Sequence, residues 1–131
     1  MAHNVDAAPS AVKVAAALMF GSAIWAALLS ISHLGVEIPV FSGLGPGGDR
    51  VILVPGVIFA VATVVNAAVA AGLLRLRSWA WLAGVVVNGL ALLSGAGQFR
   101  GAGSVIGLLL AAAALAMLLT PQARVALRGQ A

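Results

Sequence analysis

Four long apolar stretches dominate the chain and set the first limit on its fold. They occupy residues 14–31, 51–74, 79–98 and 103–120 of 131, and none contains an acidic residue. An α-helix rises 1.5 Å per residue, so about 20 residues cross the roughly 30 Å hydrocarbon core of a bilayer. We therefore expect a single membrane domain over residues 1–131, in which each stretch forms one transmembrane helix.

Composition indicates the same class of protein. Hydrophobic residues make up 63% of the chain and charged residues 8%, far from the soluble balance of about half apolar and a quarter charged. With a mean hydropathy of +1.14, the chain has more apolar surface than a soluble core can bury. The net charge of +4 comes from basic residues that stand singly or in pairs beside the apolar stretches, so we expect no nucleic-acid partner. The absence of cysteine excludes disulfides, thiol catalysis and cysteine-based metal sites.

The first apolar stretch has one feature of a signal peptide, because Lys13 precedes it. The apolar region of a signal peptide is about 7 to 15 residues long, and residues 14–31 exceed that length. His33 and Leu34 also make a poor cleavage context. We therefore expect this stretch to be a span of the mature protein.

Basic residues at the ends of the stretches orient the chain, since cytoplasmic segments carry an excess of Lys and Arg. One side collects Lys13, Arg75, Arg77, Arg124 and Arg128. The other side has only Arg50 and Arg100. We expect a multi-pass protein of the cell inner (cytoplasmic) membrane with both termini in the cytoplasm. The expected anchors at the cytoplasmic membrane interface are Arg75, Arg77, Trp79, Trp81, Arg124 and Arg128.

The connections between the stretches differ in length. Residues 75–78 and 99–102 form short links, which force the helices that they join to be antiparallel neighbours. Residues 32–50 form a longer extracytoplasmic loop, and its glycines and prolines disfavour regular structure. The predicted fold is thus all-α and membrane-embedded, a four-transmembrane-helix antiparallel bundle.

A fifth, short helix is expected in the cytoplasm over about residues 121–128. Thr120 is a good N-cap, and Pro121 is suited to the first helical position. Arg124 and Arg128, four residues apart, then share one face of this helix. We expect them to contact anionic lipid headgroups, beside the lipid bilayer that surrounds the spans.

Asn66 and Asn88 are the most polar side chains deep inside the spans. They lie at similar depth on adjacent helices, so we expect interhelical polar contacts, including a hydrogen bond between the two amides. A polar step in a ligand or ion path is the alternative. Trp25, near the middle of the first span, is expected to fill a gap between helices, with a substrate platform as the alternative.

Gly103 and Gly107 form a small-xxx-small pair at the start of the last span. Such pairs let helix backbones approach closely in a membrane. We expect this pair to serve helix packing within the bundle, and a homodimer face is the alternative.

His33 and Glu37 are weak candidates for a metal site, because their spacing of four residues places them on one helix face. A third ligand is missing nearby, since Asp49 is distant in sequence, so we expect a solvated pair and no bound metal. Gly43, Gly45 and Gly48 match the G-x-G-x-x-G spacing. That motif binds dinucleotides only between a strand and a helix, so we expect no cofactor.

Two segments resemble a known group of proteins: Gly72–Leu82, GLLRLRSWAWL, and Leu118–Leu127, LLTPQARVAL. They are similar to small uncharacterised bacterial integral membrane proteins with four spans. The resemblance covers the second half of the chain and implies no activity. Six arginines against one lysine, with abundant Ala, Gly and Val, also suit a GC-rich bacterial genome.

The four stretches lack Asp, Glu, His and Lys, the residues that catalysis or proton-coupled transport in a membrane usually needs. The leading hypothesis is therefore a non-enzymatic accessory, scaffold or regulatory subunit of a membrane complex, which requires a membrane-protein partner. The alternative is a small permease or channel acting as a homo-oligomer, with Asn66, Asn88 and Trp25 along its path. A third hypothesis is a lipid-modifying or metal-dependent enzyme that uses His33 and Glu37.

Overall fold

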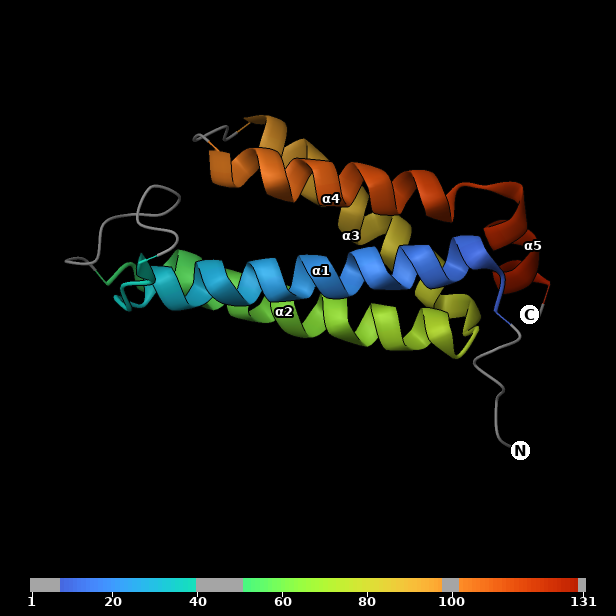
Figure 1. Ribbon diagram of the computed structural model, residues 1–131, viewed down its shortest axis with the longest axis horizontal. Helices are drawn as coiled ribbons and strands as arrows, with labels where there is room; N and C mark the ends of the chain where they lie inside the picture. Colours follow the sequence, from blue (N-terminus) through green and yellow to red (C-terminus); the bar gives the residue numbers. More distant parts are fainter. Residues whose placement is uncertain (1–7, 40–50, 98–101, 130–131) are drawn as a thin grey trace.

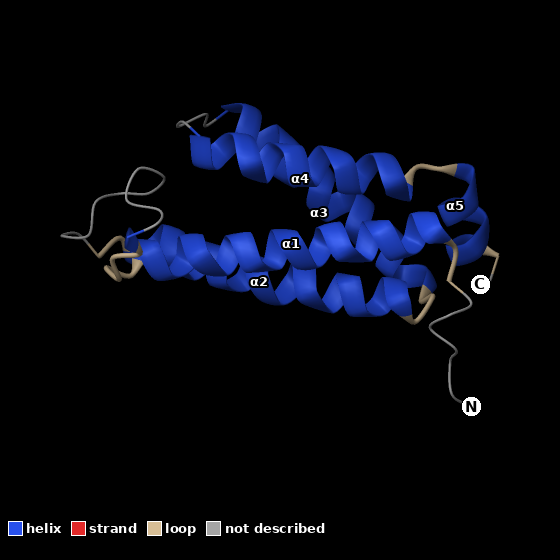
Figure 2. Ribbon diagram, in the orientation of Figure 1, coloured by secondary structure: helices blue, strands red, loops and turns tan. Residues whose placement is uncertain are grey.

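The computed structural model describes residues 8–39, 51–97 and 102–129. These residues form helices and connecting turns, with no strand in the described ranges (Figure 2). The helices are α1 (Ser10–His33), α2 (Leu53–Leu74), α3 (Ser78–Gly97), α4 (Ala102–Leu118) and α5 (Pro121–Arg128). For these residues, the expectation of an all-α fold is confirmed.

Three of these helices, α1, α2 and α3, are individually long and apolar enough to cross a membrane. The fourth apolar helix, α4, has 17 residues and a length of about 26 Å, which is at the lower limit for a helix that crosses the hydrocarbon core. It counts as a further span when it is taken together with α5, from which it is separated by a bend of 68°. The chain therefore has three to four helices that suit a multi-pass membrane protein.

Successive helices run in opposite directions along the molecule (Figure 1). Helix α1 packs most extensively against α2 and also against α4, while α3 packs against α4 and, over a smaller area, against α2. One end of the molecule holds the beginnings of α1 and α3 and the ends of α2 and α4 (Figure 1). Helix α5 lies across this end. We call this the α5 end.

The core lies mainly toward the α5 end. In α3 the buried residues are Ala80, Gly84 and Asn88, and the described residues beyond Asn88 are not buried. In α4 they are Ala111, Ala114 and Leu118, all in its second half. The described residues of α3 and α4 nearer the opposite end are not buried, so these segments contribute little to the core.

Close packing at the α5 end depends on two glycines. A Cβ atom on Gly84 would lie 2.8 Å from a methyl group of Leu118 and 3.4 Å from Val69. A Cβ atom on Gly72 would lie 2.8 Å from both Trp79 and Ala80. Glycine therefore allows α3 to approach α4 and α2 at this end.

Helices α1 and α2 both end in a Schellman motif, in which two N–H groups beyond the helix bond back to its last free carbonyls. The bonds are Val36 N–H to Ile31 O and Gly35 N–H to Ser32 O in α1, and Arg77 N–H to Gly72 O and Leu76 N–H to Leu73 O in α2. The motif needs one residue with positive φ, which is Gly35 in α1 and Leu76, at 52°, in α2. Leucine in this conformation is strained, because its Cβ crowds the neighbouring carbonyl.

The outward faces of the helices are strongly apolar. Ile24, Val64 and Leu93 are 64%, 68% and 74% exposed, respectively. Large apolar surface of this extent is rare on soluble monomers but is suited to contact with lipid. The helices therefore have the exterior that a membrane protein requires.

Candidate functional site

The polar side chains inside the apolar helices are the first candidates for function, and Asn88 is the most buried of them. Its side chain is 2% exposed. The amide Nδ2 donates to the carbonyl oxygen of Gly84 at 2.7 Å and contacts the sulfur of Met19 at 3.0 Å. Because Met19 is a fully buried residue of α1, Asn88 joins α3 to α1 in the core.

Asn66 has a different environment. It is 8% exposed, and its amide donates to the carbonyl oxygen of Ala62, one turn back in its own helix, at 2.8 Å. The hydrogen bond expected between Asn66 and Asn88 is not formed, since each amide donates to the carbonyl four residues earlier. In a helix, the carbonyl four residues earlier is always within reach of the side chain. A hydrogen bond to another helix forms only when both helices are rotated about their axes so that the two side chains face each other.

Ser30 makes an interhelical hydrogen bond that the sequence does not distinguish. Its hydroxyl, in a residue that is 6% exposed, donates to the carbonyl oxygen of Gly56 on α2 at 2.7 Å. Ser22 and Thr63 instead donate to the carbonyl four residues earlier in their own helices. The sequence signal closest to this contact is Gly56, a glycine near the start of an apolar helix, which permits close approach of α1.

Trp81 connects three helices at the α5 end. Its indole Nε1–H, on α3, donates to the carbonyl oxygen of Leu118 at the end of α4, at 2.9 Å. The guanidinium carbon of Arg128, on α5, lies 4.8 Å from the centre of the Trp81 ring, a cation–π geometry. We call this arrangement the Trp81 clasp. Trp81 is half-buried, while Trp79 is 52% exposed, so Trp79 is the more exposed of the two tryptophans expected as anchors.

The basic side chains expected at the cytoplasmic interface lie at the α5 end and are exposed. They are Arg75 and Arg77 in the link between α2 and α3, and Arg124 and Arg128 on α5. The single acidic residue in the described ranges is Glu37, which follows α1 at the opposite end. The described part of the α5 end is therefore uniformly positive.

The structure does not place His33 and Glu37 on a common helix face. α1 ends at His33, and the chain then turns through Gly35 at a φ of 89° before it reaches the exposed Glu37. The His33 Nδ1–H donates to the carbonyl oxygen of Leu29 at 2.7 Å, and its ring lies 5.2 Å from that of Phe59. Within the described residues there is no group of three side chains able to hold a metal ion, and Asp49 lies outside them.

The remaining sequence candidates are placed as follows. Gly107 faces α1, because a Cβ atom there would lie 3.7 Å from the indole nitrogen of Trp25, which is half-buried. This approach is between two helices of the same chain, and the helix-packing role expected for the Gly103 and Gly107 pair stays a prediction. The surroundings of Gly103, most of the 32–50 loop and the arginines at 50 and 100 lie outside the described residues.

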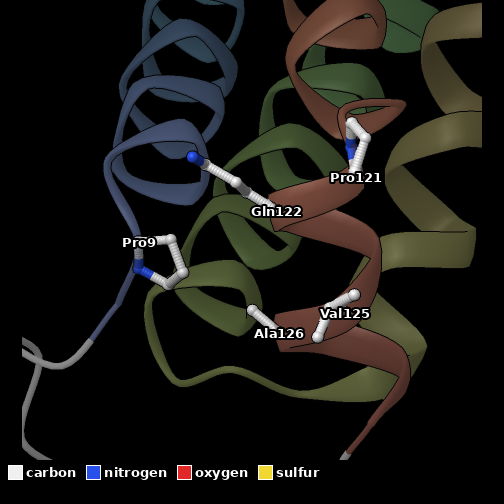
Figure 3. Close-up of a pocket in the computed structure, with 5 residues that line it drawn as sticks. All are labelled: Pro9, Pro121, Gln122, Val125 and Ala126. Carbon is white, nitrogen blue, oxygen red and sulfur yellow. The ribbon is translucent and has the colours of Figure 1, made fainter.

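An open apolar hollow of about 440 Å³ lies where α5 meets the beginning of α1. It is lined by Pro9, Pro121, Gln122, Val125 and Ala126. Gln122 and Ala126 lie on the side of α5 that is turned toward Pro9 (Figure 3). No pattern in the sequence indicates this hollow, because it is formed by residues more than a hundred positions apart.

Comparisons with protein-family models, with curated proteins and with solved structures find no match for the chain. The similarity of residues 72–82 and 118–127 to small bacterial four-span proteins therefore stays a prediction.

Proposed function

We propose that this protein is a non-enzymatic accessory, scaffold or regulatory subunit of a complex in the bacterial cytoplasmic membrane. In this proposal α1 to α4 form an antiparallel four-span bundle, the α5 end is cytoplasmic, and lipid surrounds the apolar faces. The main support is the polarity of the spans. Within the described helices α1 to α4 the ionisable side chains are Lys13 and His33, and both lie near the ends of α1.

The polar groups in the interior also favour a structural role. Asn66 donates to its own helix, and Asn88 and Ser30 tie α1 to its neighbours. Asn88 is 2% exposed, and its amide is occupied by the Gly84 carbonyl and the Met19 sulfur. These contacts stabilise the arrangement of the helices, and they supply neither a nucleophile nor a proton-transfer group.

The orientation is supported by the arginines and the tryptophan at the α5 end. A cytoplasmic end carries an excess of basic residues close to the spans, and Arg75, Arg77, Arg124 and Arg128 are exposed there. Reporter fusions check this orientation. A cytoplasmic reporter at the C-terminus should be active, and one inserted in the 32–50 loop should be inactive.

Isolation of the protein at native expression level in a mild detergent tests the subunit role. We expect one or a few membrane proteins to copurify in fixed stoichiometry, and the complex to survive dilution. A solitary protein would contradict the proposal. Solute flux through the purified protein in proteoliposomes, lost on Asn88→Leu, would replace it with the permease or channel hypothesis.

A further inference from the structure

The exposed side of α5 is mixed: Gln122, Arg124 and Arg128 are exposed there, and so is the apolar Val125. Ala123 and Leu127 are fully buried and face the ends of the spanning helices. A residue two positions away on a helix is rotated by about 200°, so Val125 points to the opposite side. Val125 is 73% exposed. It lies in the wall of the hollow, together with Pro121 and Ala126, so the outer side of the α5 end has an apolar depression.

Positive charge borders this depression. Arg124 and Arg128 lie along one edge of α5, next to Pro121 and Val125 around the helix. Arg75 and Arg77 lie at the same end, and none of the described residues there is acidic. An occupant of the hollow therefore needs apolar groups flanked by negative charge.

Helix α5 is held firmly in place. The Thr120 hydroxyl oxygen accepts from the Ala123 N–H at 3.4 Å and donates to the Met117 carbonyl at 2.7 Å, which fixes the bend between α4 and α5. The Trp81 clasp then attaches the last turn of α5 to α3. A surface ordered before binding loses less conformational entropy when a partner arrives.

We propose that the hollow and the two arginines of α5 form a binding surface for an acidic amphipathic segment of a partner protein. The proposal rests on the proposed function, since it names the class of partner that an accessory subunit would hold. Membrane lipid is the weaker occupant, because Val125 faces away from the apolar helices and so away from the bilayer that they would span. A second copy of the chain is also weaker, because its three acidic residues, Asp6, Glu37 and Asp49, stand far apart in sequence.

Anisotropy of a fluorescein-labelled helical peptide tests the surface directly. The peptide carries leucines at helical spacing with glutamates around them, and it is titrated with the full chain in a neutral detergent. We expect saturable binding that weakens about tenfold in R124Q/R128Q, through the loss of two charge pairs. Val125→Glu should weaken it at least as much, since it places a carboxylate in the apolar hollow. R75Q/R77Q, with the same change in net charge at the same end, should alter the Kd less than twofold.

Several outcomes would overturn the surface: no binding, equal weakening by both arginine pairs, or equal binding of a peptide with lysines in place of the glutamates. If R124Q/R128Q and R75Q/R77Q weaken peptide binding equally, the peptide responds only to the net charge of the protein. A third result would assign the two arginines to a lipid headgroup: the unchanged protein does not bind the peptide, and R124Q/R128Q retains less phosphatidylglycerol in nanodiscs than the unchanged protein does. Helicity and tryptophan emission should match those of the unchanged protein, and R124Q alone serves if Arg128→Gln loosens the Trp81 clasp.

The experiment also separates this surface from the subunit role. A copurifying partner that stays bound to both R124Q/R128Q and Val125→Glu leaves the subunit role standing and overturns the surface. If the peptide binds as expected but the protein is solitary in its native membrane, the surface stands and the subunit role is overturned.

Discussion

At the scale of single residues, the two buried asparagines differ in what their loss should cost. Asn88 spans from α3 to Met19 of α1, and Asn66 bonds only within α2. We expect Asn88→Ala to lower the free energy of unfolding by about 1–3 kcal/mol through a cavity and a lost interhelical contact. Asn66→Ala should cost less. Equilibrium unfolding in mixed micelles measures both, and an equal or larger effect at Asn66 would contradict this reading of the contacts.

Two glycines of α3 provide a second contrast. Gly84→Ala places a methyl group 2.8 Å from Leu118, whose side chain is fully buried and has little room to move. We expect a loss of about 1–3 kcal/mol in the free energy of unfolding, from overpacking. Gly89→Ala is the matched control, because a Cβ atom there meets nothing within 4 Å. The same unfolding assay should find Gly89→Ala neutral or slightly stabilising, and similar losses at both sites would show that the close approach of α3 to α4 is not real.

At the scale of elements, the end of α2 depends on a leucine in a conformation that glycine adopts more easily. Leu76 is half-buried, so both Leu76→Ala and Leu76→Gly remove its packing. Only glycine also removes the strain of positive φ, which is about 1 kcal/mol. Leu76→Gly should therefore unfold at higher denaturant concentration than Leu76→Ala. The reverse order, which is usual in the interior of helices, would exclude the Schellman motif at this end.

The attachment of α5 should depend on Trp81 and not on Trp79. Trp81→Phe removes the hydrogen bond to the Leu118 carbonyl and weakens the cation–π contact, a combined loss of about 1–2 kcal/mol. We expect faster hydrogen exchange at the amides of residues 125–128, measured by mass spectrometry. Trp79→Phe leaves both contacts intact and should leave that exchange unchanged. Protection that persists in Trp81→Phe would mean that burial of Leu127 alone holds α5.

Each level of the structure was predictable to a different extent. Apolar length is read directly from a sequence, so residues 14–31, 51–74, 79–98 and 103–120 all lie largely within helices of similar bounds. Contacts between helices depend on the rotation of each helix about its axis, which composition does not determine. Ser22 and Ser30 look alike in sequence, yet only Ser30 reaches another helix. The hollow beside α5 likewise arises from a bend of 68° that brings Pro9 and Pro121 together.

At the scale of the whole molecule, the uneven core determines which parts are held together. The buried residues of α3 and α4 lie from the middle of each helix toward the α5 end, and the described residues 89–97 and 104–110 are not buried. Few buried contacts mean low local stability. The chain has no cysteine, so spin labels can be introduced at single positions. We expect a broad distance distribution between labels at Ile58 and Leu93, toward the opposite end, and a narrow one between Val14 and Leu82. Equally narrow distributions would contradict this.

Because the buried residues of α3 and α4 lie toward the α5 end, these two helices are held most firmly there, like rods clamped at one end. Small rotations at the clamp, where Asn88 meets Met19 and α5 crosses the helix ends, become larger displacements at the far ends of the rods. In the proposed orientation, a protein that binds at α5 would change the lateral width of the molecule in the leaflet farther from α5. Under the proposed topology, the fold would then transmit an event on one side of the membrane to lipids or helices on the other, without a pore and without a moving charge.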